Sequence, residues 1–346
     1  MKKFLFIFFL LVACSCVQLE LSPEDDTSDR TKISFRVNWG ELEEASRPDS
    51  TFIALNNISE EIHYLFETDS EGNYLPDNHH DSSAFYGSYV MLAYYCDKDN
   101  YILSGTKNFL SDNAVSVRDF KARVKDLPEG ELEEFKAGSK LDFNSAYRFI
   151  RTPGPVWAAF AKNVVSDTRG NLFHFTMTPL QQTITFSIKL TPADGVSIHS
   201  VLAELSGVPA SFSLLTGEVN EEDLARVFFK MNPSDGGFEG TVAVPAVLPS
   251  ENNRLRTGPG ILRLSITAEK DGVSRILYPA VNIGDKIVEL SLLETIPGTD
   301  RRRIARRQVR IELDEKLEIN SDSFSGSGGD NGVTAWFDSG VIDVEV

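Results

Sequence analysis

Hydrophobic and polar residues alternate along many short stretches of this chain, which is the pattern of half-buried β-strands. The stretch 33–39 alternates between apolar residues and Ser, Arg or Asn, and 183–190 shows the same alternation. The run 89–96 is instead almost continuously apolar, and it is short enough for a buried strand. These three stretches predict β-structure both early and late in the chain.

Further strand candidates are separated by clusters of Gly, Pro, Asn and Asp, which favour turns. They are 63–68, 101–103, 156–161, 172–177, 198–205, 225–231, 238–247, 260–269, 274–280, 286–293, 307–313 and 339–346. Many short strands with turns at fairly regular spacing indicate an all-β sandwich. The chain shows no alternation of helices and strands, so a parallel α/β sheet is not expected.

The one stretch that favours a helix is 118–137. Phe120, Val124 and Leu127 are spaced by four and three residues, so they would share one face of a helix. Pro128 then ends this face, and the residues after it can add one further turn. We expect this segment to be a surface insertion or crossover in the first part of the chain.

The composition is that of a globular protein and not of a disordered, collagen-like or disulfide-rich chain. The chain has 346 residues, of which 41% are hydrophobic, and its 23 Phe suit the half-buried face of a sheet. This length allows two domains. We place the joint at 178–182, where one strand ends and an alternating strand follows. The formal net charge of −17 argues against nucleic acid as a partner.

The first residues have the form of a bacterial lipoprotein signal. Two lysines precede the apolar run 4–12, which is too short to cross a membrane, because about 20 apolar residues are needed. The run leads into Leu-Val-Ala-Cys ending at Cys14, which resembles the bacterial lipobox. In that motif the signal is cut before the cysteine, and a diacylglycerol is attached to its side chain. We therefore expect lipid on Cys14. Cys16 fits the motif less well, and a plain signal peptide is the alternative.

These signals divide the chain into four expected parts. Residues 1–13 form the signal peptide, and 14–31 form a lipidated tether that is rich in acidic and small polar residues. The N-terminal domain is expected to span 32–179 and the C-terminal domain 180–346.

Several pieces of the sequence together carry a resemblance to a known family. They are the lipobox, the acidic tether, the strand 35–39 with Arg47 and Pro48 after it, 87–95, 152–157, the joint 177–186, and the Gly-rich stretch 328–333 followed by Trp336 and a closing alternating strand. This set resembles a family of Bacteroidales surface lipoproteins with two β-sandwich domains. In layout the chain is similar to fimbrillins and to their FimB-type anchor subunits.

The resemblance implies an all-β fold of two tandem Greek-key, transthyretin-like β-sandwich domains, with a short helical insertion in the first. It also implies a surface-exposed protein that is anchored in the outer membrane through the lipid on Cys14 and takes part in adhesion. Its partners would be other fimbrial or surface subunits. Fimbrillins are commonly cut after an arginine, and a cut after Arg30 would free the lipid but leave the first strand. This position favours an anchor or accessory subunit.

In such systems a groove in one subunit accepts a strand of the next, so that main-chain hydrogen bonds give affinity and alternate side chains fill pockets. The candidate strands are 33–39 and 341–346. In the closing strand, Ile342, Val344 and Val346 lie on one face and are the candidate strand-exchange residues. The alternative is an ordinary terminal strand that completes its own sheet.

The sequence shows no signature of catalysis or metal binding, and we predict no enzyme activity, cofactor or metal site. It holds 5 His, with no Gly-x-Ser-x-Gly and no His-Glu-x-x-His. The adjacent His79 and His80 would point apart on an extended chain. The loop 322–332 lacks the closing Glu of a calcium loop. Cys96 lies in an apolar run and is expected to be a small buried hydrophobe.

The only basic cluster is 301–310, with arginine at most of its positions. Such a run is typical of a solvated loop that leads into a strand. It could also pair with the acidic tether or with lipopolysaccharide phosphates.

A glycan-binding surface lipoprotein of a polysaccharide-uptake system is the alternative function. Such proteins stack sugar rings on exposed aromatic side chains, and the candidates are Trp157, Tyr86, Tyr89 and Trp336. A glycan binder should expose a coplanar aromatic pair beside polar groups. A fimbrial subunit should show a long apolar groove or a detachable terminal strand.

Overall fold

The computed structural model describes residues 29–40, 42–58, 62–75, 83–105, 116–138, 148–166, 169–235, 237–250 and 258–319. The fold is an all-β sandwich architecture with short helical segments. The elements of the first half are β1 (Arg30–Asn38), β2 (Ser50–Asn57), β3 (His63–Asp69), β4 (Ser83–Phe85), β5 (Gly87–Cys96), β6 (Tyr101–Ser104), β7 (Lys121–Val124), α2 (Glu129–Gly138), β8 (Phe149–Ile150), β9 (Val156–Val165), β10 (Asn171–Thr176) and β11 (Thr178–Pro179).

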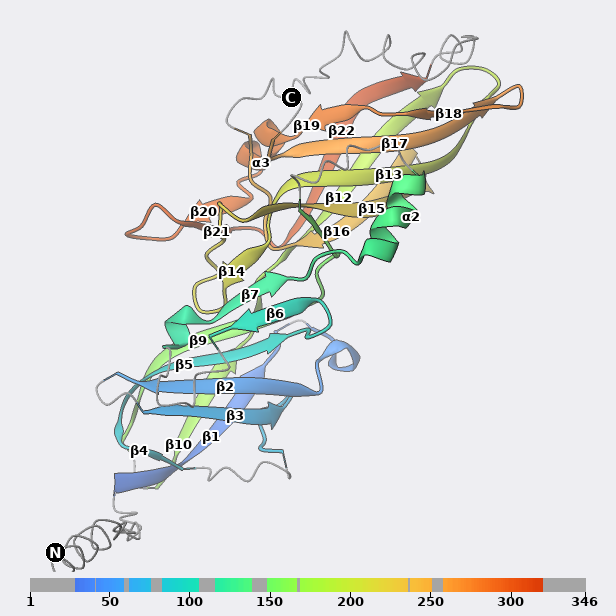
Figure 1. The fold of residues 1–346 in the computed structure, drawn as a ribbon. Helices are drawn as coiled ribbons and strands as arrows, with labels where there is room; N and C mark the ends of the chain where they lie inside the picture. The colour runs from blue at the N-terminus through green and yellow to red at the C-terminus, as the bar shows by residue number, and fades with distance from the viewer. Residues whose placement is uncertain are drawn as a thin grey trace, which may run out of the picture.

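Two sheets form a sandwich at one end of the molecule (Figure 1). One sheet has the order β10-β1-β4, and the other has the order β11-β9-β5-β2-β3. Strand β1 alternates strictly between buried and exposed positions. Its buried side chains, such as Phe35, and Trp39 directly after the strand pack in one core with Phe66 and Met91 of the facing sheet. The alternation in the sequence therefore reflects one face in the core and one face in water.

Strand β5 is buried on both faces, which explains its continuous apolar sequence. Tyr89 and Met91 point into the sandwich core, whereas Leu92 and Tyr94 point to the opposite side. That side is covered by a small third sheet of order β14-β7-β6. Successive side chains of a strand point to opposite faces, so both sets find an apolar partner.

The second half is built from a larger set of strands. They are β12 (Gln182–Pro192), β13 (Val196–Pro209), β14 (Ser211–Ser213), β15 (Leu224–Ser234), β16 (Gly237–Val244), β17 (Ile261–Lys270), β18 (Val273–Leu277), β19 (Ala280–Asn282), β20 (Leu293–Thr295), β21 (Arg302–Ile304) and β22 (Gln308–Ile319), with the short helix α3 (Gly284–Glu289). The main sheet runs β18-β17-β13-β15-β16-β12-β22 and folds over a buried core. Strands β20 and β21 form a separate hairpin, hereafter the arm.

The two halves repeat one topological feature that the sequence does not show. The first strand of the first half, β1, pairs in parallel with β10 near the end of that half. The first strand of the second half, β12, likewise pairs in parallel with β22. The limits 32–179 and 180–346 for two domains remain a prediction.

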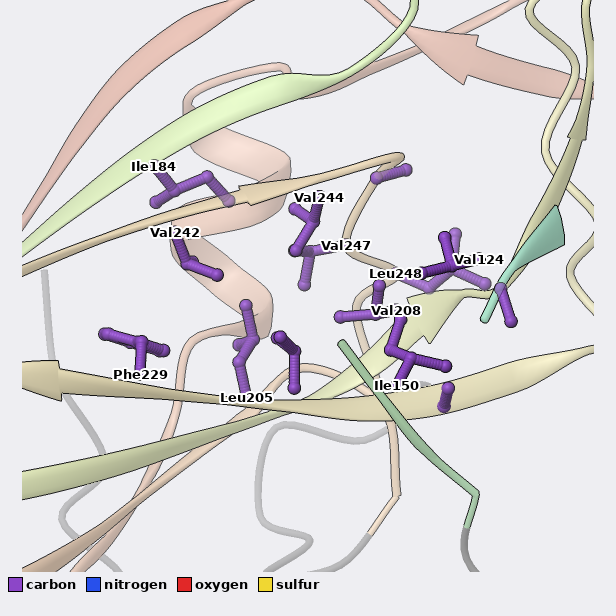
Figure 2. Packing of buried hydrophobic residues seen from close by; sticks show 14 of the residues in the cluster. Val124, Ile150, Ile184, Leu205, Val208, Phe229, Val242, Val244, Val247 and Leu248 are labelled. Carbon is purple, nitrogen blue, oxygen red and sulfur yellow. The ribbon is translucent and has the colours of Figure 1, made fainter. Parts of the chain in front are cut away.

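The halves are joined by backbone pairing and by a shared core. Strand β14 of the second half pairs with β7 of the first, and β8 pairs with β15. Val124 and Ile150 of the first half pack beside Val208 and Leu248 of the second (Figure 2). This apolar contact excludes water from the joint and stabilises the arrangement of the two halves.

Two predicted elements are wrong. The stretch 118–127 is not helical: a short 3-10 turn, Val117–Asp119, is followed by strand β7. Phe120 and Val124 are both buried, as is Ala122 between them, and a spacing of four fits a strand of period two as well as a helix. The predicted strand 286–293 begins instead as helix α3.

The helix in the first part of the chain begins only after Pro128. Helix α2 packs Leu132 and Phe135 against Phe149 and Phe228, and Phe228 belongs to β15 of the second half. The insertion therefore covers the sheet of the other half (Figure 1). Its first turn carries Glu129 and Glu131, which suit the positive end of the helix dipole.

Candidate functional site

Strand β9 leaves most of one edge without a neighbouring strand. On one side it pairs with β5 along its whole length, from Val156 to Val165. On the other side β11 pairs only with Trp157 and Ala158. From 159 to 165 the second edge has no paired strand among the described residues. This segment of β9 is called the open edge.

The hydrogen bonds of β11 show which residues of β9 direct their backbone groups outward. The carbonyl of Val156 accepts from the Leu180 N–H at 3.0 Å, and that of Ala158 accepts from the Thr178 hydroxyl at 3.1 Å. In an antiparallel strand every second residue points its N–H and C=O to the same side. Phe160, Lys162 and Val164 therefore direct their backbone groups to the open edge.

The same three residues carry exposed side chains. Phe160 is 48% exposed and Val164 is 56% exposed, and both rank among the large apolar side chains that the described part of the fold leaves in water. Lys162 is exposed between them. It has no ion pair within the described ranges. An edge with unpaired backbone groups and two apolar side chains is a template for another strand.

A groove of about 380 Å³ begins at this edge, where the two halves meet. Its apolar walls are Phe160 of β9, Leu180 after β11, and Leu214 and Leu215 in the turn after β14. His174 of β10 also lines it. The groove offers space for apolar side chains at the end of the open edge.

A second, larger groove lies between the 3-10 turn before β7, the turn after β14 and the arm. Its volume is about 880 Å³, and it is lined on one side by Arg118 and Lys121 and on the other by acidic residues such as Glu222 and Asp300. The buried Phe212 contributes to its wall. The mixture of charges gives this groove no clear preference for a cation or an anion.

The arginine cluster forms local ion pairs. Arg302 of the arm donates two hydrogen bonds of 2.6 Å to Glu221, and these bonds lower the pKa of that carboxyl group. Arg301 pairs with Glu218 at 2.9 Å, and Arg303 pairs with Glu294 at 2.7 Å. Arg310 pairs with Glu239 and Glu312. Arg301 and Arg302 therefore hold the arm against the segment that follows β14.

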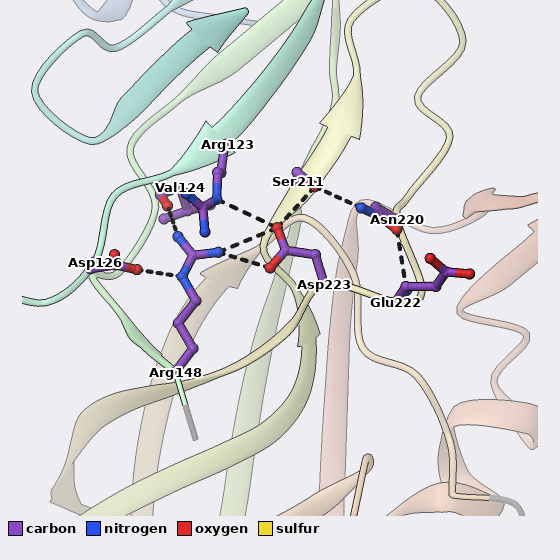
Figure 3. Close-up of polar contacts among 8 residues, drawn as sticks. All are labelled: Arg123, Val124, Asp126, Arg148, Ser211, Asn220, Glu222 and Asp223. Carbon is purple, nitrogen blue, oxygen red and sulfur yellow. Dashed lines mark hydrogen bonds and ion pairs between the residues drawn. The ribbon is translucent and has the colours of Figure 1, made fainter. Parts of the chain in front are cut away.

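A network of polar side chains ties the two halves together beside the larger groove (Figure 3). Arg148 pairs with Asp126 and Asp223, and its remaining nitrogen donates to the carbonyl of Val124 at 2.8 Å. Asp223 also accepts from the Ser211 hydroxyl at 3.1 Å. Each carboxylate oxygen of Asp223 thus has a donor, which fixes the geometry of the joint.

The described aromatic candidates for glycan stacking do not form a coplanar exposed pair. Tyr89 is fully buried, and its hydroxyl donates to the carbonyl of Phe85, so its ring has no face open to a sugar. Trp157 is partly buried and meets Trp39 edge-on at 72°. Tyr86 is partly buried against the sandwich core. These three residues therefore do not form the coplanar exposed aromatic pair that is expected of a glycan binder.

The first candidate exchange strand is held in place. Residues 33–38 of β1 pair with β10, and Arg30 at its start pairs with Phe85 of β4 and places its guanidinium 4.4 Å from the ring centre. Removal of β1 would expose the core side chains Phe35 and Val37. The open edge of β9 is a different location, which the sequence analysis missed. The order of residues along β9 does not mark which of its edges lacks a neighbour.

The other predicted site residues lie outside the described residues. They are the lipidation residue Cys14 with Cys16, the strand residues Ile342, Val344 and Val346, the aromatic Trp336, the pair His79 and His80, and the loop 322–332. Within the described ranges, no three His, Cys, Asp or Glu side chains lie close enough to hold a metal ion. No described helix is both long and apolar enough to span a membrane.

Comparisons with known proteins show which fold this chain has. No protein-family model matches it, and no curated protein matches it. It is similar to the solved structure of a candidate adhesin from Bacteroides ovatus ATCC 8483, with a TM-score of 0.51 and 11% identity, over 84% of this chain and 92% of that chain. At this identity the likeness shows the fold alone.

Two further solved structures are similar at lower scores. A candidate polysaccharide-binding protein from Bacteroides thetaiotaomicron VPI-5482 has a TM-score of 0.45 and 12% identity, over 82% of this chain and 89% of that chain. The fimbrial anchor protein Mfa2 from Porphyromonas gingivalis has a TM-score of 0.38 and 12% identity, over 74% of this chain and 84% of that chain.

Proposed function

We propose that this protein is a cell-surface subunit that takes part in adhesion, as a fimbrial anchor or accessory subunit or as an adhesin. It is held at the outer membrane by lipid on Cys14, and it joins other subunits by β-strand pairing. The open edge of β9 carries this proposal. Its backbone groups at Phe160, Lys162 and Val164 face outward, and a groove with apolar walls begins beside it. An added strand would gain main-chain hydrogen bonds and bury apolar surface in one step.

The assembly part is tested on native outer membranes. An immunoblot is run in detergent gel buffer with and without heating, because strand-paired assemblies resist detergent until they are boiled. We expect a heat-sensitive band or ladder of high mass for the wild type. The variant with Phe160→Asp and Val164→Asp should run as monomer in both lanes, since two charges at the edge oppose burial.

The matched control for this experiment is Val273→Asp. Val273 is 40% exposed on β18, an edge strand of the other half, so its substitution changes a similar surface elsewhere. The control variant should still give the heat-sensitive high-mass ladder in the unheated lane. A wild type that gives only monomer in both lanes would contradict assembly by strand pairing, and a glycan array would then test the alternative function.

The membrane part is tested by Cys14→Ala. Each buried acyl CH₂ contributes about 0.8 kcal/mol to membrane binding, and a lipid with more than one chain gives stable anchoring. We expect the variant to leave the membrane fraction while its circular dichroism spectrum and melting temperature stay unchanged. Persistent membrane association of the folded variant would overturn the lipid anchor.

A further inference from the structure

We infer that the open edge of β9 selects a strand of another protein subunit in which an acidic residue stands between two apolar residues at alternate positions. This inference rests on the proposed function and names the chemistry of the partner at the same site. It is built on the order Phe160, Lys162, Val164 along one face of the edge.

The geometry of the edge fixes which residues of a partner lie opposite these three. Their N–H and C=O groups point outward, so an added antiparallel strand would form its hydrogen-bonded pairs with them. Residues directly opposite each other in such pairs have Cβ atoms about 5 Å apart, close enough to interact. The partner thus presents one side chain to Phe160, one to Lys162 and one to Val164.

Each of these positions favours a different chemistry. Phe160 and Val164 are exposed and apolar, so apolar residues opposite them remove surface from water on both strands. Lys162 has no ion pair in the described part of the chain, and an opposite charge facing it contributes favourably. The preferred partner strand therefore has five successive residues with the pattern apolar, any residue, acidic, any residue, apolar.

The same lysine disfavours pairing between two copies of this protein. A two-fold arrangement of two β9 edges that uses all three outward residues would place Lys162 directly opposite its counterpart, with Phe160 opposite Val164. Like charges directly opposite each other are destabilising, and lysines on edge strands commonly prevent self-association. The edge thus discriminates against its own copy and accepts an acidic strand.

The closing run of this chain does not have the preferred pattern. One set of its alternate residues is Val341, Asp343 and Glu345, and the other is Ile342, Val344 and Val346. Neither places an acidic residue between two apolar ones. The closing run is therefore not the strand that the open edge prefers.

The test uses three synthetic peptides of equal length and the purified full-length protein with Cys14→Ser. The first is Thr-Val-Thr-Asp-Thr-Val-Thr, the second has Lys in place of Asp, and the third is the closing segment 340–346. Binding is followed by fluorescence anisotropy of labelled peptides. We expect the Asp peptide to bind about tenfold more tightly than the Lys peptide, from the cross-strand charge pair. The closing segment should also bind more weakly than the Asp peptide.

Two variants of the protein make the result specific to the edge. Lys162→Glu should reverse the preference, so that the Lys peptide binds more tightly. Lys162→Pro should abolish binding of all peptides, because proline removes the outward N–H, while the β5 side of the strand keeps its hydrogen bonds. Circular dichroism and melting temperature verify that both variants are folded.

Equal binding of the Asp and Lys peptides, no reversal in Lys162→Glu, or no binding of the Asp peptide to the wild-type sequence would each overturn the inference. This failure differs from failure of the proposed function. A ladder in native membranes that is lost with Phe160→Asp and Val164→Asp would uphold assembly even if the peptides show no charge preference.

Discussion

The guanidinium of Arg148 donates to both carboxylate oxygens of Asp223, at 3.0 and 3.3 Å, although the two residues are 75 positions apart in the chain (Figure 3). Arg148 precedes β8 of the first half, and Asp223 precedes β15 of the second. The side chain of Arg148 is only 17% exposed. Both bonds come from one nitrogen, Nη1, while Nε bonds Asp126 and Nη2 bonds the carbonyl of Val124. The three partners together fix the orientation of the planar guanidinium, so Arg148 locks the joint between the halves.

Replacing Arg148 with Met should lower the free energy of unfolding by about 1–3 kcal/mol, because Asp223 and the carbonyl of Val124 lose donors in a partly buried site. Urea denaturation measures this change. The control is Lys136→Met, which removes an exposed i,i+3 pair with Glu133 and should cost less than about 0.5 kcal/mol. Equal effects of the two substitutions would show that the Arg148 pair contributes no more than a surface ion pair.

Replacing Gln182 with Met should raise stability. Gln182 is fully buried on the inner face of β12, next to Ile184 on the same face, and neither polar atom of its amide has a hydrogen-bond partner among the described residues. A buried polar group without partners costs about 1–3 kcal/mol, and Met fills a similar volume without polar amide atoms. We expect a higher melting temperature by calorimetry. A lower one would mean that the amide makes a stabilising contact.

Replacing Gly207 with Ala should be markedly more destabilising than replacing Gly272 with Ala. Both glycines have positive φ, +76° and +78°, and both substitutions force an L-residue into the left-handed region, at about 1–2 kcal/mol. At Gly207, where β13 is bulged, a Cβ would lie 2.5 Å from the Cβ of Pro259. At Gly272 no atom of the part of the chain that the structure describes lies within 4 Å of the added Cβ. Chemical denaturation of both variants isolates the cost of the clash with Pro259, because the cost of the positive φ is common to both. Equal losses in the free energy of unfolding would contradict the clash.

Cys96 should react with thiol reagents only when the protein unfolds. Its side chain is buried, and burial raises the pKa of the thiol to about 12, so at pH 8 the folded protein holds almost no thiolate. The protein with Cys14→Ser and Cys16→Ser has Cys96 as its only thiol. We expect slow labelling of this protein by a chromogenic disulfide in buffer and fast labelling in concentrated urea. Fast labelling of the folded protein would contradict the burial.

The same shift predicts how stability depends on pH. A thiol whose pKa is raised in the folded state keeps its proton there longer than in the unfolded chain. Its contribution to stability is therefore complete below the ordinary pKa of 9.0 and decreases as the pH rises from there toward about 12. Cys96→Ala should remove this part of the alkaline decrease in melting temperature.

A strand could be predicted from the sequence where its order of apolar and polar residues reflects which of its faces are buried. β1 alternates because one face meets the core, and β5 is continuously apolar because both faces do. The all-β class follows from many such patterns. Strand β7 shows where prediction from the sequence fails, because a spacing of four between Phe120 and Val124 fits both a helix and a strand. Only the burial of Ala122 between them distinguishes the two.

The sequence by itself determined the fold class and most strands, because these depend on local period and composition. Only the tertiary structure decided that β14 pairs with β7, that Arg148 meets Asp223, and that β9 keeps an open edge. These features depend on which distant segments become neighbours. Whether a strand lies at an edge is set by the absence of a neighbour, and an absent neighbour leaves no mark on the strand's own alternation.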